Sequence, residues 1–393
     1  MNESDDDDDS SSCQSDQLAE LLDDELFSHC SSAAISEKGI REIIQRHKNS
    51  TPHHRRLFHA ALSNEKVTEE IIRCLLEYFP AAANDADFFR GQMQLHYACN
   101  CKNVSIGIIR LLIDAYPDAV RHQDRGGYIP LNNLCNNTEL DEAAAIEILK
   151  LLLEKYPDSV RHKCSRSMNH LPIHFAVMAA KSPEFCSVLI EAYPGSERIP
   201  AISTGMLPFH IACVTSVATV EYLYNLYPDA IDQAASGAYP IHHAITSLTR
   251  MPENNQALQV DANEGLKIVK FLLDCDPRVK FQEVTQGESL LHFACRRDYD
   301  QTSTIVALGI IEAICDAHPE LIRKEDGNGQ LPLHKLCAKS SQDNTTTMAI
   351  LGLLLEKYPE SIQRADNEGL FPIHIAAMTN SNKAQSSPCS DLL

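Results

Sequence analysis

Apolar residues recur along the chain with the spacing of amphipathic helices. In the segment 109–116, isoleucine, leucine, isoleucine and tyrosine fall at i, i+3, i+4 and i+7, on one face of a helix. The same stripe ends in an aromatic residue and a proline in several copies: IIRLLIDAYPDAV ending at Val120, ILKLLLEKYPDSV at Val160 and LGLLLEKYPESI at Ile362. Because proline rarely continues a helix, each copy predicts a helix that stops just before it.

A second phrase alternates with these stripes. It consists of a glycine, two residues, a proline, an aliphatic residue and a histidine, followed by small residues; examples are GMLPFHIAC from Gly205 and GLFPIHIAA from Gly369. Asn132 replaces the histidine in the third copy, GYIPLNNLC from Gly127. The repeat histidines are His59, His96, His174, His210, His242, His292, His334 and His374.

Each repeat unit is predicted to contain two helices. The proline of the second phrase suits a first helical turn, where its missing N–H costs nothing, and a short helix of about two turns should follow. After the second helix we expect an extended stretch, such as 119–122, and a turn around Asp-x-x-Gly. Glycine, or Asn169 in one copy, occupies the turn position, which favours a positive φ there. One such unit cannot bury its apolar face alone, so the units must stack.

This pattern resembles the ankyrin repeat, which has a Thr-Pro-Leu-His-x-Ala phrase within about 33 residues. The resemblance covers roughly residues 51–380. It implies an all-α, ankyrin-type repeat solenoid of helix-turn-helix units with short hairpin-like fingers. The threonine that would bond the histidine is replaced in most copies, for example by Met93 and Ile129, and only Ser289 keeps a hydroxyl. Apolar packing is expected to replace that hydrogen bond.

The ends of the chain differ from the repeats. Residues 1–16 are predicted to be a disordered, acidic, Ser-rich tail, and residues 17–50 a helical cap with Ser36 as an N-cap. Residues 51–380 hold about nine units, the last truncated, and 381–393 form a polar tail. Polar insertions at 251–264, 298–303 and 340–347 are expected in loops.

Composition narrows the classes of function. The chain carries a net charge of −20, which disfavours nucleic-acid binding, and no uncharged apolar run approaches the length of a membrane span. The opening MNESDDDDDSSS lacks the pattern of a secretory signal, and the fourteen cysteines follow no disulfide framework. These features favour an intracellular protein, cytoplasmic or nuclear and not secreted, and leave the oligomeric state open.

The recurrent histidines and cysteines could suggest a metal- or thiol-dependent enzyme. Repeat histidines should lie about 8–10 Å apart in stacked units, whereas metal ligands converge within about 2 Å of one ion. We expect each histidine to bond the backbone and fix its turn. The cysteines at Cys99, Cys135, Cys213, Cys295 and Cys337 should pack as small buried hydrophobes. The sequence therefore predicts no catalytic residues, metal or other cofactor, and a non-catalytic scaffold that binds one or more proteins on a concave face of fingers and first helices. An adaptor that delivers a client protein to another machinery is the alternative.

Three fingers carry the candidate binding residues, and the basic side chains of the second and third suit a protein partner with an acidic surface. The aromatic candidates are Phe88 and Phe89, and the charged ones are Arg121, His122, Arg125, Arg161, His162, Lys163 and Arg166. Ser4, which precedes five aspartates, is a candidate phosphorylation site. The acidic tail has two interpretations: it keeps the protein soluble, or it competes with an acidic ligand for the basic fingers.

Overall fold

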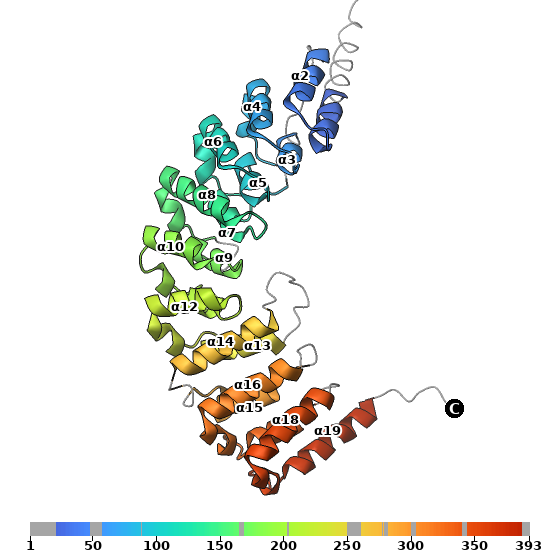
Figure 1. Cartoon of the computed structure of the whole chain (residues 1–393), viewed down its shortest axis with the longest axis vertical. Coiled ribbons are helices and arrows are strands. Elements are labelled where there is room, and N and C mark those ends of the chain that lie inside the picture. Colours follow the sequence, from blue (N-terminus) through green and yellow to red (C-terminus); the bar gives the residue numbers. More distant parts are fainter. Residues whose placement is uncertain are drawn as a thin grey trace, which may run out of the picture. The chain divides into compact units, whose positions relative to one another are not determined.

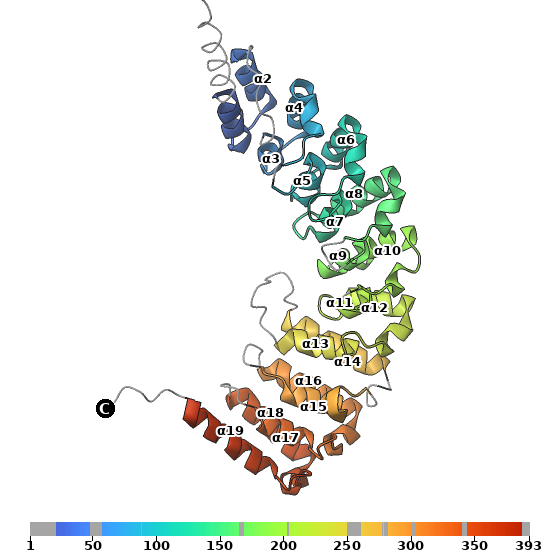
Figure 2. The same cartoon turned by 180° about the vertical axis from the view of Figure 1, so that it is seen from behind.

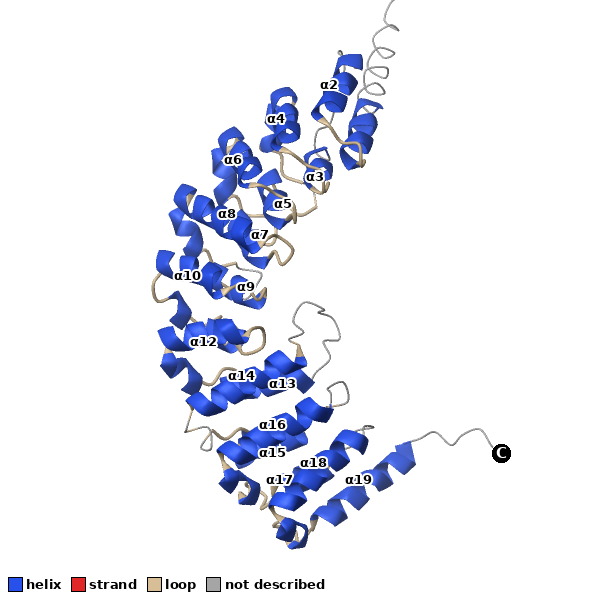
Figure 3. Cartoon of the chain, in the orientation of Figure 1, coloured by secondary structure: helices blue, strands red, loops and turns tan. Residues whose placement is uncertain are grey.

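The chain is built almost wholly of helices. The computed structural model describes residues 21–47, 57–87, 89–164, 169–202, 204–249, 261–276, 278, 282–299, 304–339 and 344–386. Within these residues the elements are α-helices and short 3-10 helices, and the only extended pairing is two isolated β-bridges, Cys164–His170 and Ala235–Ala238 (Figure 3). The predicted all-α class is confirmed. The chain divides into unit 1, Met1–Ser196, and unit 2, Glu197–Leu393.

Unit 1 consists of two rows of helices behind a helical segment at 21–31. First helices of the repeats stack on first helices, and second helices on second helices (Figure 1). The first row holds α3 (Leu57–Leu62), α5 (Gln94–Asn100), α7 (Pro130–Asn136) and α9 (Pro172–Met178). The second row holds α2 (Glu37–Arg46), α4 (Glu69–Tyr78), α6 (Ile106–Ala115), α8 (Glu142–Lys155) and α10 (Pro183–Ala192).

Unit 2 repeats this arrangement (Figure 2). Its first helices are α11 (Pro208–Ala212), α13 (Pro240–Thr249), α15 (Leu290–Arg296), α17 (Pro332–Cys337) and α19 (Pro372–Ser386). Its second helices are α12 (Val217–Leu226), α14 (Ala262–Cys275), α16 (Thr304–Ala317) and α18 (Asn344–Lys357). Among the described residues, no helix has both the length and the apolar character needed to cross a membrane.

Local sequence signals explain where the helices begin. Proline occupies the first turn of most first helices, as at Pro130 in α7. The second helices of unit 1 begin after a side chain that accepts a backbone N–H: Ser105 Oγ accepts from Ile108 N at 3.2 Å, and Asp141 Oδ2 from Ala144 N at 3.1 Å. Each cap satisfies one N–H that would otherwise have no partner in the first turn.

One sequence expectation about the units is wrong. The stretch after a second helix is not extended: residues Pro117–Arg121 form a 3-10 helix, and so do Pro157–Arg161, Pro228–Asp232, Pro319–Arg323 and Pro359–Gln363. The physical reason lies in the proline, which fixes φ near −65° and starts a new turn. The carbonyl of Tyr116 then accepts a hydrogen bond from Ala119 N at 3.1 Å, which closes that turn.

The finger turns follow the sequence prediction. All seven predicted glycines and Asn169 have positive φ, for example 78° at Gly127 and 56° at Asn169. The aspartate of the turn holds it closed: Asp124 Oδ1 accepts from Gly126 N at 2.7 Å and from Tyr128 N at 2.9 Å. Asp326 and Asp366 make the same pair of bonds in unit 2. Each of these fingers is therefore held by hydrogen bonds between its aspartate side chain and its own backbone.

The predicted boundaries near the chain ends agree only in part. Ser36 is the N-cap of α2, as predicted, and its Oγ accepts from Gly39 N at 3.2 Å. In the helical segment at 21–31, Leu22 and Leu26 are buried and Leu21 is exposed. Helix α19 runs through Ser386, beyond the predicted boundary at 380, and α14 starts inside the predicted insertion at 251–264. The acidic tail with Ser4, the residues Phe88 and Arg166, and the segment 387–393 lie outside the described residues.

Candidate functional site

The most developed pocket among those described lies in unit 1, between two fingers and the first-helix row. Its volume is about 530 Å³, within the range of about 300–1,000 Å³ common for ligand sites. The fingers contribute Phe89, Arg90, Gln92, Asp124, Arg125, Gly126 and Tyr128, and the helices contribute His59, Tyr97, Asn100, Asn132, Asn133 and Asn136. We call the surface formed by these fingers and by α3, α5 and α7 the first-helix face of unit 1.

Two smaller pockets continue this surface toward the cap. One of about 220 Å³ lies between α3 and α5 and shares His59, Tyr97 and Asn100 with the main pocket. The other, about 490 Å³, lies between α3 and the helical segment at 21–31, where it is bordered by Phe27. Because His59 borders all three pockets, they adjoin one another, and together they extend from the helical segment at 21–31 to α7; we call them the row of pockets.

Hydrogen bonds between neighbouring fingers set the rim of the main pocket. Arg125 N donates to the carbonyl of Arg90 at 2.7 Å, and Arg125 Nη1 donates to the carbonyl of Phe89 at 3.4 Å. Gln92 Nε2 donates to Asp124 Oδ2 at 2.9 Å. The Phe89 side chain, 82% exposed, stands on this braced rim.

The helix side of the pocket is polar and aromatic. The rings of His59 and Tyr97 lie 4.4 Å apart between centroids. Burial and the Asp87 carboxylate raise the pKa of Tyr97 to about 12, so its hydroxyl stays protonated. Asn133 Nδ2 donates to the carbonyl of His96 at 3.1 Å, which leaves its oxygen available as an acceptor, and Asn136 is exposed. This side of the pocket can therefore both donate and accept hydrogen bonds.

The repeat histidines act on the backbone of their own and the next unit. In six of them Nδ1 accepts the backbone N–H that precedes the helix, as His96 does from Met93 N at 3.2 Å. In three, Nε2 donates to a carbonyl of the next finger: His96 to Tyr128, His210 to Gln233 and His292 to Gln330, at 2.7–3.1 Å. Only Ser289 adds a hydroxyl contact, 2.7 Å from His292 Nδ1. In the other five, the backbone N–H bonds Nδ1 without an added hydroxyl.

Three positions depart from this scheme. His59 is exposed and stacks on Tyr97. His242 is fully buried against Phe293, and neither of its ring nitrogens has a hydrogen-bond partner among the described residues. Asn132 makes one of the two hydrogen bonds that a repeat histidine makes. Its Oδ1 accepts from Ile129 N at 3.0 Å, whereas its Nδ2 has no partner in the described part of the chain.

The predicted finger residues fall into two groups. Phe89 and Arg125 border the pocket. Arg121 and Arg161 instead stack on tyrosines at the ends of the following second helices, 5.2 Å from the Tyr156 ring and 5.0 Å from the Tyr193 ring. His122 and His162 donate from Nε2 to the carbonyls of Gly91 and Gly127, at 3.0 and 2.8 Å. Lys163 is exposed but is not among the pocket residues.

The cysteines lack the surroundings of reactive thiols. Cys99, Cys135, Cys213 and Cys295 are buried and Cys337 is half-buried. Burial raises the pKa of Cys337 to about 11 and raises the pKa of the other four as well, so these thiols stay protonated near neutral pH. No three His, Cys, Asp or Glu side chains in the described ranges gather as a set of metal ligands.

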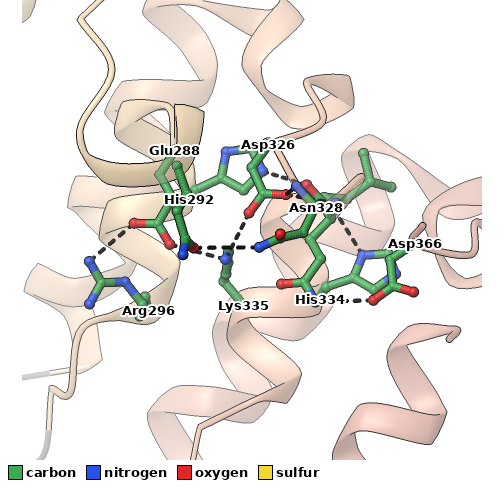
Figure 4. A network of polar contacts seen from close by, with 12 residues as sticks. Glu288, His292, Arg296, Asp326, Asn328, His334, Lys335 and Asp366 are labelled. Atoms are coloured by element: carbon green, nitrogen blue, oxygen red, sulfur yellow. Dashed lines mark hydrogen bonds and ion pairs between the residues drawn. The ribbon is translucent and has the colours of Figure 1, made fainter. Parts of the chain in front are cut away.

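Unit 2 contains a buried charged network that the sequence analysis missed (Figure 4). Lys335 Nζ lies 2.8 Å from Asp326 Oδ2 and 3.0 Å from Glu288 Oε1, and Arg296 binds the other oxygen of Glu288 at 3.1 Å. Burial opposes the charge of Lys335, but the carboxylates of Asp326 and Glu288 outweigh it and raise the pKa of this lysine. A lysine held protonated in this way is neither a nucleophile nor a base. The network holds two neighbouring repeats of unit 2 together.

Sequence reasoning noted Asn132 but gave it no role, and it missed Arg90, Tyr97, Asn133 and Asn136. A signal was present: α7 reads PLNNLCN, with Asn132 at the histidine position and Asn133 where the other repeats have histidine, lysine, an aromatic or an aliphatic residue. Four asparagines in the segment 132–137 exceed what packing of a short helix requires. Asn137 uses one of them structurally, since its Nδ2 donates to the carbonyls of Cys99 and Cys101.

Comparison with known proteins shows likenesses among solved structures. No protein-family model matches the chain, and no curated protein matches it. Among solved structures, the chain is similar to the crystal structure of the human ASB11 ankyrin repeat domain, with 17% sequence identity and a TM-score of 0.46 over 66% of this chain and 97% of that chain. The repeated helix pairs, their first-turn prolines and their fingers, on their own, make the chain an array of ankyrin-type repeats.

Proposed function

We propose that the chain is a non-catalytic scaffold that binds a protein partner on the first-helix face of unit 1. The single observation that carries this proposal is the main pocket, whose rim holds an exposed aromatic ring, Phe89, beside the guanidinium groups of Arg90 and Arg125. Aromatic and arginine side chains on a rigid support are typical of residues that dominate binding energy at protein interfaces. The braced fingers supply that rigid support.

The charges of the rim favour a partner with an acidic surface. Arg90 and Arg125 are both exposed, whereas the nearby Asp124 is buried and already bonded to its own finger and to Gln92. An acidic partner would therefore meet positive charge first, and the attraction should weaken as salt rises.

The alternatives gain less support. A thiol enzyme needs an activated thiolate, and the repeat cysteines are protonated. A metal enzyme needs converging ligands, and the repeat histidines bond backbone atoms instead. An adaptor needs a second docking surface besides the first-helix face, and the described residues offer unit 2 as the place to search for it.

The test is affinity capture with the full chain, followed by binding measurements with the purified partner. We expect Phe89→Ala combined with Arg125→Glu to weaken binding by about a hundredfold, since two interface residues of these types each contribute at least about 1–2 kcal/mol. Arg323→Glu, a finger-side arginine of unit 2, is the matched control and should change affinity less than twofold. Equal binding by wild type and the double variant would exclude this face as the interface.

A further inference from the structure

Asn132 borders the main pocket and carries an unpaired donor. Its side chain is 0% exposed, its Oδ1 accepts from Ile129 N, and its Nδ2 has no partner among the described residues. In the preceding repeat, His96 occupies the same helical position, and its Nε2 reaches the carbonyl of Tyr128. Asparagine is shorter than histidine, so Asn132 accepts the backbone N–H before the helix but does not reach a carbonyl of the next finger. A buried N–H without an acceptor is unfavourable, and a bound acceptor would relieve it.

The other donors of the pocket make a charged acceptor the best match. Arg90 and Arg125 border the same pocket as Asn132, and a guanidinium group is a cation with five N–H donors in a planar fork. The opposing carboxylate, Asp124, has both oxygens bonded within the fingers. Hydrogen bonds from a guanidinium to a carboxylate are among the strongest in proteins. Since Asp124 also borders the pocket, a singly charged carboxylate suits it better than a doubly charged phosphate.

The row of pockets indicates an extended chain. Stacked helices are about 8–10 Å apart, and three residues of extended peptide span about 10 Å, so side chains of such a peptide would recur in step with the units. Tyr97 and Asn100 border two pockets of the row, and side-chain amides such as those of Asn100 and Asn133 can pair with peptide N–H and C=O groups.

We propose that the main pocket receives an aspartate or glutamate side chain from an extended segment of the partner. The carboxylate accepts a hydrogen bond from Asn132 Nδ2 and is neutralised by Arg90 and Arg125, while the peptide runs across Tyr97 and Asn100 toward His59. This inference rests on the proposed function, because it specifies what the first-helix face binds.

The experiment uses the full chain and a synthetic library of ten-residue peptides, each with one fixed position. We expect glutamate or aspartate to be enriched at one position, and replacement of that residue by its amide to weaken binding about tenfold. Arg90→Gln with Arg125→Gln should weaken binding of the selected peptide tenfold or more. Asn132→His, which restores the repeat histidine, should weaken it about fivefold. Arg110→Gln, an exposed arginine on α6, is the control and should stay within twofold.

A second readout reports on Asn132 itself. The NMR signal of its side-chain NH₂, assigned by its absence from Asn132→His, should shift with the acidic peptide and not with its amide version. Asn132→His should also unfold at the same temperature as wild type or higher, since histidine fills this position in other units, so lost binding would not reflect lost folding.

The outcomes separate this inference from the proposed function. If a purified partner protein binds the first-helix face but the library shows no acidic preference, the proposed function holds and the carboxylate site is wrong. A phosphoserine peptide that binds tenfold more tightly than the glutamate peptide would also overturn the carboxylate assignment. If Phe89→Ala with Arg125→Glu leaves partner binding intact, the proposed function itself fails.

Discussion

Units 1 and 2 use equivalent helix positions for different purposes. The residue after the repeat histidine position is Asn133 in α7 of unit 1 and Lys335 in α17 of unit 2. Asn133 borders an open pocket, whereas Lys335 is 8% exposed and is paired with two buried carboxylates. The finger aspartates show the same difference, since Asp124 is held by a neutral glutamine and Asp326 by the lysine. One repeat can therefore keep its fold while its first-helix position serves either recognition or bracing.

The largest effect expected from this difference concerns Lys335. Lys335→Met should lower the free energy of unfolding of unit 2 by about 3–5 kcal/mol, because Asp326 would stay buried without its cation and Glu288 would keep only Arg296. Asn133→Ala in unit 1 removes one hydrogen bond and should cost about 1 kcal/mol. Urea denaturation of the full chain, with hydrogen exchange to locate the loss, measures both. Equal costs would contradict a bracing role for the lysine.

The next largest effect concerns acid pH, which should destabilise unit 2 more than unit 1. Burial lowers the pKa of His210 to about 4 and of His242 to about 3 in unit 2, and it also lowers that of His292 and His334. In unit 1 burial lowers the pKa of His96 to about 4, but α7 carries Asn132, which does not titrate.

The sign of the effect follows from these directions. A histidine with a lowered folded-state pKa stabilises the fold fully above its unfolded value of about 6.5, and this stability is lost as pH falls toward the folded value. With a folded pKa of about 4, His210 loses about 2 kcal/mol at pH 5. Hydrogen exchange at pH 7 and pH 5 should therefore show a larger loss of protection in unit 2. His242→Asn should reduce that loss, and equal losses in both units would count against this explanation.

Glycine substitutions test how the position of a repeat in the array affects unfolding. Gly127 and Gly369 both have a φ of 78°, so valine at either position should cost about 1–3 kcal/mol. Stability in a repeat array is approximately a sum of unit and interface terms. Gly127→Val, between stacked units, should split unfolding into separate transitions, whereas Gly369→Val should fray only the end. A single identical transition for both variants, followed by circular dichroism, would argue against repeat-array behaviour.

Most of the fold could be predicted from the sequence, because the repeat exposes it many times over. Helix pairs, first-turn prolines, positive-φ glycines and the Ser36 cap all depend on residues that act within a few positions of themselves. The extended stretch after the second helix was predicted wrongly, because the carbonyl of Tyr116 closes a 3-10 turn that an apolar pattern does not reveal.

The site was harder to predict because it depends on contacts between units. Charge alone selected Arg121 and Arg125 equally, yet one stacks on Tyr156 and the other borders the pocket. Lys335 is buried only because stacking places Glu288 beside it. Asn132 contributes to the site through its Nδ2, which has no hydrogen-bond partner among the described residues. Such features become predictable only when the neighbouring unit is placed.

The smallest expected effect distinguishes these two arginines. Arg121→Ala should lower the free energy of unfolding by about 0.5–1 kcal/mol, since it removes a cation–π contact with Tyr156, and should leave partner affinity unchanged. Arg125→Ala should do the reverse, weakening partner binding by about tenfold with little change in stability. Unit 2 supplies the control, because Arg323 lies 4.8 Å from the Tyr358 ring in the same arrangement.

Arg323→Ala should therefore reproduce the stability loss of Arg121→Ala in thermal unfolding. If Arg121→Ala instead weakened partner binding as much as Arg125→Ala does, the interface would extend beyond the first-helix face onto the ends of the second helices. The stacked arginines of unit 1 would then bind the partner as well as brace the repeats, and the parallel drawn with Arg323 would fail.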